Sequence, residues 1–174
     1  AIEDGATVPV HYQLRNRKWH MDGLDLDKIV ESEYGDLYGE DELNALKKKA
    51  GQFSTFMMTP KRLQSIGDDI AQHFKEHVEP NGYKAQVVCF NRKACVIIKE
   101  QLDSLLGDGV CEIIYTGAQN DEEPLRKYHY SGEKQKEIVR NFKNPEDPLK
   151  ILLVQSMLLT GFDAPVEQVM YLDR

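Results

Sequence analysis

The sequence has few cysteines and no long apolar run, and each shortage removes a class of protein. The three cysteines, Cys89, Cys95 and Cys111, are odd in number and show no C-x-x-C spacing. This argues against a disulfide framework or a cysteine zinc site and favours a reducing compartment. No apolar stretch approaches the roughly 20 residues that span a bilayer, and the acidic N-terminus has no signal-peptide core. The composition is that of a globular protein.

The chain also lacks an excess of positive charge, because its net charge is −7 at pH 7. Residues 22–42 hold nine acidic residues against one lysine, a local charge of −8, so the rest of the chain carries about +1. The acidity is therefore local, and it does not exclude a polyanionic partner from every face.

The N-terminal third shows one strand pattern and one acidic segment. In residues 7–15, Val8, Val10, Tyr12 and Leu14 alternate with polar residues, which predicts a half-buried strand. Pro9 places that strand at a sheet edge. Residues 22–42 have no sustained apolar period, and we expect a solvated loop with a short helix there. Because the chain begins without Met and stops directly after a strand-like segment, we also expect a piece of a longer protein.

From residue 59 onward, helical and strand patterns alternate. Thr59 as N-cap and Pro60 predict the start of a helix that ends before Gly82, and Asn91 and Ser131 open two more. Strands are predicted at 85–90, 111–117, 150–155 and 166–173. This alternation predicts an α/β fold with a parallel sheet and helices on both faces. Residues 1–80 are expected to pack, as an edge strand and helices, on a core formed by residues 81–174, within one structural domain.

Small and polar residues follow three of the predicted strands. Ligands of open parallel sheets bind outside the carboxyl ends of the strands. At one of these ends, "LLTGFDAP" (158–165) offers the hydroxyl of Thr160, the side-chain-free backbone of Gly161 and the carboxylate of Asp163. The alternative is a tight turn in which Asp163 caps and Pro165 prevents a helix.

Several motifs, taken in order, resemble one family. "KILLVQSMLLTGFDAPVEQVMYLDR" resembles motif V and the following strand in the motor subunit of type I restriction enzymes, which belong to the superfamily 2 helicases and translocases. "KAQVVCFNRKAC" resembles motif IV, and "IYTGAQND" and "SGEKQKEIVRNFKNPEDPLKILLV" continue the order. "AIEDGATVPVHYQLR" resembles the entry to the second motor lobe. The resemblance covers nearly the whole chain, most weakly residues 17–58.

The resemblance implies a RecA-like second motor lobe, the helicase C-terminal lobe, truncated before motif VI. Gly161 and Asp163 would touch the nucleotide from this lobe. The positions implied to lie near the DNA backbone, or to couple nucleotide and DNA, are Phe90, Asn91, Arg92, Thr116, Gly117 and Thr160. For Arg92 and its neighbour Lys93, simple exposure at a helix start is the alternative. Ser156 stands where many family members have Asp, which puts any charge-dependent contact there in doubt.

The motifs that are absent limit what this chain does alone. It has no G-x-x-x-x-G-K-[ST] phosphate loop, no Mg²⁺-binding acid of the first lobe and no motif VI arginine. ATP and Mg²⁺ are thus expected cofactors of the full-length protein but not of this piece. We predict that the purified chain has neither ATPase nor nuclease activity, and measurable steady-state ATP hydrolysis would contradict this.

The resemblance also implies partners. These are double-stranded DNA, the first RecA-like lobe and nuclease domain of the same protein, and the methyltransferase and specificity subunits of a restriction complex. The location implied is the prokaryotic cytoplasm, with no membrane association.

Three other interpretations remain at this point. One is another superfamily 2 motor acting on RNA or in DNA repair, and another is a non-catalytic α/β interaction module. A Gln- and Arg-rich motif VI after Arg174 would favour a motor over the module. The third is a zinc protein, because "HFKEH" fits H-x-x-E-H with His73 and His77 on the wet side of a helix. His129, between Tyr128 and Tyr130, is expected at the surface, where a tyrosine could stack on a base.

Overall fold

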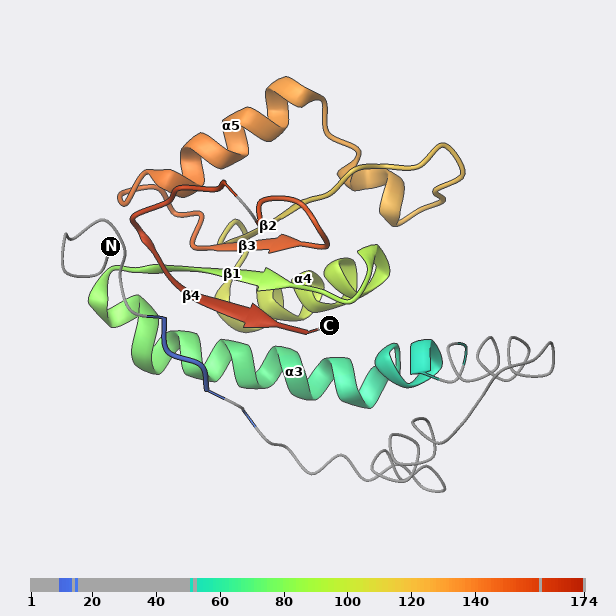
Figure 1. Ribbon diagram of the computed structural model, residues 1–174, viewed down its shortest axis with the longest axis horizontal. Helices are drawn as coiled ribbons and strands as arrows, with labels where there is room; N and C mark the ends of the chain where they lie inside the picture. The colour runs from blue at the N-terminus through green and yellow to red at the C-terminus, as the bar shows by residue number, and fades with distance from the viewer. Residues whose placement is uncertain (1–9, 14, 16–50, 52, 160, 174) are drawn as a thin grey trace, which may run out of the picture. The chain divides into compact units, whose positions relative to one another are not determined.

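The structure is a computed structural model that describes residues 10–13, 15, 51, 53–159 and 161–173 (Figure 1). Backbone contacts divide the chain into two units, residues 1–45 and 46–174. The fold described below is that of the second unit.

The second unit is built on a sheet of four parallel strands. These are β1 (Lys84–Val88), β2 (Cys111–Ile114), β3 (Ile151–Val154) and β4 (Glu167–Leu172), in the order β2-β3-β1-β4. The two central strands, β1 and β3, are buried at every residue. The sequence of β3 is a continuous apolar run, as expected for such a strand, whereas β1 also carries Lys84 and Gln86. The parallel sheet predicted from the sequence is confirmed.

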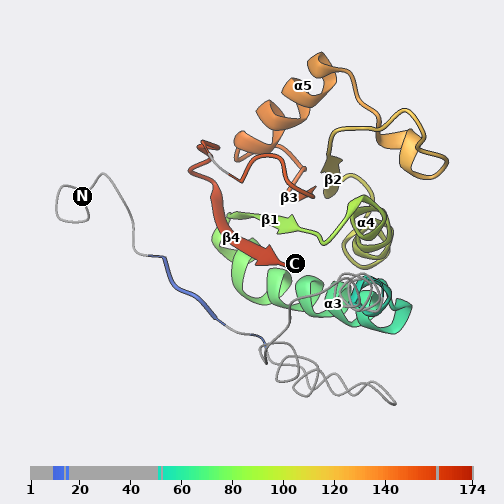
Figure 2. The same ribbon diagram turned by 45° about the vertical axis from the view of Figure 1, so that its right-hand side comes forward.

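Helices cover both faces of this sheet (Figures 1 and 2). On one face lie α3 (Pro60–His73) and α4 (Arg92–Leu106), and on the other lies α5 (Gly132–Lys143). α3 continues as a π-helical turn (Phe74–Val78) and a 3₁₀ turn (Glu79–Asn81), and a 3₁₀ helix (Leu125–Tyr128) precedes α5. The result is a three-layer α/β arrangement, consistent with a RecA-like fold.

Alternate residues of each strand serve the two apolar cores. Ala85 and Val87 of β1 face the α3 and α4 layer, whereas Val88 faces α5. The core under α5 is the smaller of the two, and it also takes partly buried residues from the segment that follows β3. Its members include Val88, Ile114, Ile138, Phe142, Leu152 and Val154, with Met157, Leu158, Leu159, Phe162 and Ala164 packed against them.

The helix boundaries follow the capping residues seen in the sequence. The Asn91 side chain accepts a hydrogen bond from the Ala94 N–H at 2.8 Å, and that of Ser131 accepts one from the Lys134 N–H at 3.2 Å. Gly82 ends the α3 region with a φ of 75°. Thr59 occupies the N-cap position but does not cap, because its hydroxyl donates to the Thr55 carbonyl instead.

The predicted N-terminal edge strand is wrong for the described residues. Residues 10–13 have no regular secondary structure, and Val10 and Tyr12 are 69% and 89% exposed. An alternating pattern forms a strand only where another strand presents a free edge for its backbone hydrogen bonds. The described pairings of the sheet use only β1 to β4. Val8, Leu14 and the acidic segment 22–42 lie outside the described residues.

One charged side chain is buried inside the α5 layer. Lys84 is fully buried, and its Nζ donates to the carbonyls of Asn144 at 2.6 Å and of Asn141 and Asp147 at 3.3 Å. Burial lowers the pKa of Lys84 to about 8, with Lys150 adding to the effect and Asp147 opposing it. Lys84 opens β1, so this contact places the end of α5 beside the amino ends of the strands.

Among the described residues, no helix combines the length and apolar character needed to cross a membrane.

Candidate functional site at the carboxyl edge of the sheet

The carboxyl ends of β1, β2 and β3 meet at one edge of the sheet, as expected for parallel strands. The segments that leave these ends carry Phe90 and Asn91 after β1, and Thr116 and Gly117 after β2. Four of the residues singled out in the sequence are therefore brought to the same edge. Thr116 and Gly117 are exposed, and Phe90 and Asn91 are half-buried.

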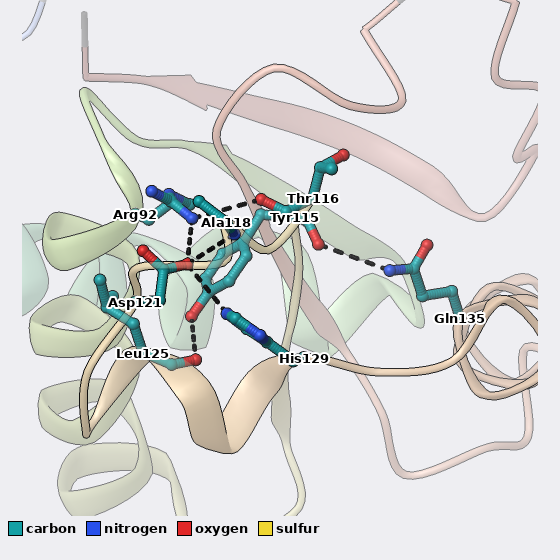
Figure 3. A network of polar contacts seen from close by, with 8 residues as sticks. All are labelled: Arg92, Tyr115, Thr116, Ala118, Asp121, Leu125, His129 and Gln135. Atoms are coloured by element: carbon teal, nitrogen blue, oxygen red, sulfur yellow. Dashed lines mark hydrogen bonds and ion pairs between the residues drawn. The ribbon is translucent and has the colours of Figure 1, made fainter.

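Asp121 is the centre of a polar network at this edge (Figure 3). One oxygen of its buried carboxylate, Oδ2, accepts from the Ala118 N–H at 2.8 Å, contacts His129 Nε2 at 2.9 Å and pairs with the Arg92 guanidinium. The Ala118 hydrogen bond, followed by His129 and Arg92, lowers the pKa of Asp121. The carboxylate therefore stays ionised and holds the loop after β2 against the start of α4.

The network gives His129 and Arg92 structural roles that sequence reasoning missed. His129 is exposed as predicted, but its ring is tied to Asp121. Arg92 is also in contact with the Thr116 carbonyl at 3.4 Å, and its guanidinium lies over the Tyr115 ring at 5.8 Å. Asp121 stands in the "YTGAQND" motif, but no sequence spacing indicates that it would meet a residue 29 positions earlier.

Tyr115 anchors the same loop from beneath. Its hydroxyl donates to the Leu125 carbonyl at 2.7 Å, and its own carbonyl accepts from Gln135 Nε2 at 3.4 Å (Figure 3). Burial raises the pKa of Tyr115 to about 12, so the hydroxyl remains a donor. The loop after β2 is therefore attached to α4, to the 3₁₀ helix and to α5.

Gly117 is required by the close approach of His129. A Cβ at Gly117 would lie 2.7 Å from three ring atoms of His129, too close for any side chain. Nearby, Phe90 packs edge-on against Phe53 at 5.8 Å, and Asn91 Nδ2 contacts Met58 Sδ at 3.2 Å. These predicted site residues thus have packing functions in the free chain.

Gly161 and Asp163 lie in the segment that connects the end of β3 to the start of β4. Between them, Phe162 stacks on Phe142 near the end of α5 at 6.1 Å, and the Val166 carbonyl accepts from the Lys84 N–H at 2.8 Å. The segment returns across the α5 face because apolar residues on both sides of Gly161 bury surface there. Thr160 lies outside the described residues.

Gly161 and Asp163 are nevertheless accessible. Gly161 has a φ of 67°, which favours glycine, and a Cβ there would meet no atom within 4 Å. Asp163 is exposed. Ser156, where many members of the resembling family have Asp, is exposed and contacts Gln155 Oε1 at 3.3 Å.

The H-x-x-E-H histidines do not assemble a metal site in the described part of the chain. His73 is half-buried rather than wet, and its Nδ1 lies 2.8 Å from the Tyr171 hydroxyl of β4. His77 is exposed and faces Glu76 at 3.7 Å. Over the described ranges, no group of three or more potential metal ligands is arranged around one point.

Comparison with known proteins gives relatives of one kind. The HindI type I restriction enzyme endonuclease subunit of Haemophilus influenzae is 34% identical over 100% of this chain and 17% of its own length. The putative MjaVIIP type I endonuclease subunit of Methanocaldococcus jannaschii is 34% identical over 100% of this chain and 19% of its own length. A second M. jannaschii subunit, the putative MjaIXP, is 26% identical over 98% of this chain.

No protein-family model matches the chain, and no solved structure matches it significantly. The chain spans 17–19% of the length of the curated relatives that it matches. Residues at the carboxyl edge and residues that shape the core all fall within the shared region, because that region is the whole chain. The chain is therefore homologous, from end to end, to one segment of the endonuclease subunits of type I restriction enzymes.

Proposed function

We propose that this chain is the second RecA-like lobe of the ATP-dependent DNA-translocating motor in a type I restriction endonuclease subunit. The observation that carries the proposal is that homology to these subunits runs over the full chain, while the chain folds as a three-layer α/β unit with a parallel sheet. The ordered motifs "VVCFNR", "YTGAQND" and "LLTGFDAP" support the same assignment.

The DNA-facing surface in this proposal is the carboxyl edge of the sheet. Thr116 and Gly117 expose a hydroxyl and a backbone there, and the Asp121 network holds both on a fixed loop. Such groups contact phosphates and sugars without reading base sequence, which suits a motor that moves along any DNA. Arg92 adds positive charge at this edge, but its ion pair with Asp121 partly neutralises that charge and reduces its contribution to phosphate binding.

The nucleotide-facing residues in this proposal are Gly161 and Asp163. Open backbone at Gly161 and an exposed carboxylate at Asp163 fit an acceptor for ribose or a charged partner. In this proposal, Mg²⁺ and the phosphate cradle belong to the first lobe. When bound, ATP supplies the free energy of closure between the lobes.

The partners follow from the same proposal. They are double-stranded DNA, the first lobe and nuclease domain of the same protein, and the methyltransferase and specificity subunits, in the prokaryotic cytoplasm. This chain closes the cleft and grips the DNA backbone, and it performs no catalysis alone.

Replacing Thr116 by Asp in the full-length subunit tests the proposed DNA edge. A carboxylate at this exposed position repels phosphate, so we expect the DNA concentration for half-maximal ATPase activity to rise about 10-fold or more, with a larger rise at low salt. Ser104→Asp adds the same charge at an exposed position near the other end of α4 and should have little effect. Equal effects of the two variants would contradict the placement of DNA at this edge.

A further inference from the structure

Gln86 is a polar residue at the centre of the buried sheet. It lies in the middle of β1, opposite Leu152 of β3 and Met170 of β4, and it is fully buried. Its side chain shares the α5 face with Lys84 and Val88, and the core on that face is formed by apolar side chains. An apolar side chain of the same length would fill this position without a polar group to satisfy.

The amide of Gln86 has one hydrogen bond where it has room for several. Nε2 donates to the Leu158 carbonyl at 3.4 Å, and among the described residues Oε1 has no partner. The orientation of the amide is determined by this contact, because a carbonyl oxygen only accepts and the nitrogen must face it. A buried acceptor is thus left unsatisfied beside the segment that carries Gly161 and Asp163.

Leu158 itself holds an unfavourable backbone conformation. Its φ is 61°, in the left-handed region, and no other non-glycine residue in the described part of the chain has a positive φ. Leu158 marks the point where the chain turns back from the end of β3 across the α5 face. Leu158, whose backbone is strained, and Gln86, whose Oε1 is unsatisfied, are therefore joined by one hydrogen bond. Such unfavourable features persist where the surrounding structure enforces them.

We infer that Gln86 is a positioning residue for the segment around Leu158, which its amide anchors through the Leu158 carbonyl. The anchor is a single long hydrogen bond, and the strain at Leu158 favours departure from the present backbone conformation. The effect of Gln86 on the motor rests on the proposed function, because Gln86 acts by positioning the segment that carries Gly161 and Asp163.

Gln86→Met in the full-length subunit, assembled with its partner subunits, tests the inference. Methionine is unbranched and of similar length, so it keeps the packing while removing both polar atoms. We expect ATP-driven translocation to slow about 10-fold. Amide hydrogen exchange in residues 157–163 should become faster, and exchange in β1 and β3 should stay at wild-type rates. The unfolding temperature should remain equal or rise, because an unsatisfied acceptor is gone.

Leu152→Met is the matched control, since Leu152 is the register partner of Gln86 and equally buried. It should leave translocation and the exchange of 157–163 unchanged. If Gln86→Met fails to accumulate, Gln86→Leu gives the same comparison. Wild-type translocation with unchanged exchange would overturn the inference. So would a general loss of stability with faster exchange throughout the sheet, because Gln86 would then be only a structural residue.

Failure of this inference can be told apart from failure of the proposed function. If Asp163→Ala abolishes translocation but Gln86→Met does not change it, the role of Gln86 is wrong and the motor assignment stands. If neither variant affects translocation, the nucleotide role proposed for Asp163 and the inference that rests on it both fail.

Discussion

Replacing Asp163 by Ala in the full-length subunit is expected to lower ATP-driven translocation about 100-fold while leaving the fold intact. The size of the effect follows from the loss of a charged contact that acts only when the motor closes on its nucleotide. Stability is spared because Asp163 is exposed, so its side chain contributes no core packing. Translocation is measured by triplex displacement and stability by thermal unfolding of the same preparation.

Asp108→Ala is the matched control for Asp163. Asp108 is also an exposed aspartate, but it lies in the turn between α4 and β2, outside the segment 158–165. Wild-type translocation is expected from this variant. If Asp163→Ala behaves like Asp108→Ala, Asp163 has no role at the nucleotide, and the segment 158–165 is a turn.

Replacing Lys84 by Met is expected to lower the free energy of unfolding of this chain by about 2–4 kcal/mol. The substitution leaves the carbonyls of Asn141, Asn144 and Asp147 at the end of α5 without their shared donor. It also removes a cation from the negative end of the helix dipole. Methionine nearly preserves the volume, so the loss measures the polar contacts. Urea unfolding followed by circular dichroism gives the value.

Lys136→Met serves as control, because Lys136 is an exposed lysine on α5, the helix whose end Lys84 contacts. Its replacement should change stability by less than about 0.5 kcal/mol. An equal loss from both variants would show that the change in net charge, and not burial of Lys84, decides the result.

The pH dependence of the wild-type chain provides a second measurement of Lys84. Its folded-state pKa, about 8, lies below its ordinary value of 10.5. Between these two values the unfolded chain binds more protons than the folded chain, so the Lys84 contribution to stability increases as pH rises from about 8 to 10.5. This pH dependence should be present in the wild type and absent from Lys84→Met, so the difference between their free energies of unfolding should change over this pH range.

Local sequence signals predicted the elements of the second unit well. Asn91 and Ser131 open helices where the sequence places caps, and Gly82 ends the α3 region. The mostly apolar segments 85–90 and 150–155 predicted strands, and β1 and β3 form there. These signals are short-range, because a cap or a buried run is satisfied within a few residues or by any apolar neighbour.

Predictions that depended on contacts between distant residues were less successful. The alternation around Val10 and Tyr12 indicated a strand, but a strand needs a partner that the sequence does not identify. The sequence also did not indicate that Phe162, next to Asp163, would stack on Phe142 of α5. The sequence places Gln86 between apolar residues, but it does not indicate that the amide would meet the Leu158 carbonyl.

By itself, the sequence determined the parallel α/β fold of the second unit and, through its ordered motifs, the kinship with type I restriction endonuclease subunits. The tertiary structure alone decided which polar groups meet. Asp121 pairs with Arg92 and His129. Lys84 donates hydrogen bonds to carbonyls at the end of α5, and Gln86 donates one to the carbonyl of the strained Leu158. The reason is physical: periodicity and capping report on neighbours along the chain, whereas a buried polar contact depends on the close packing of residues far apart in it.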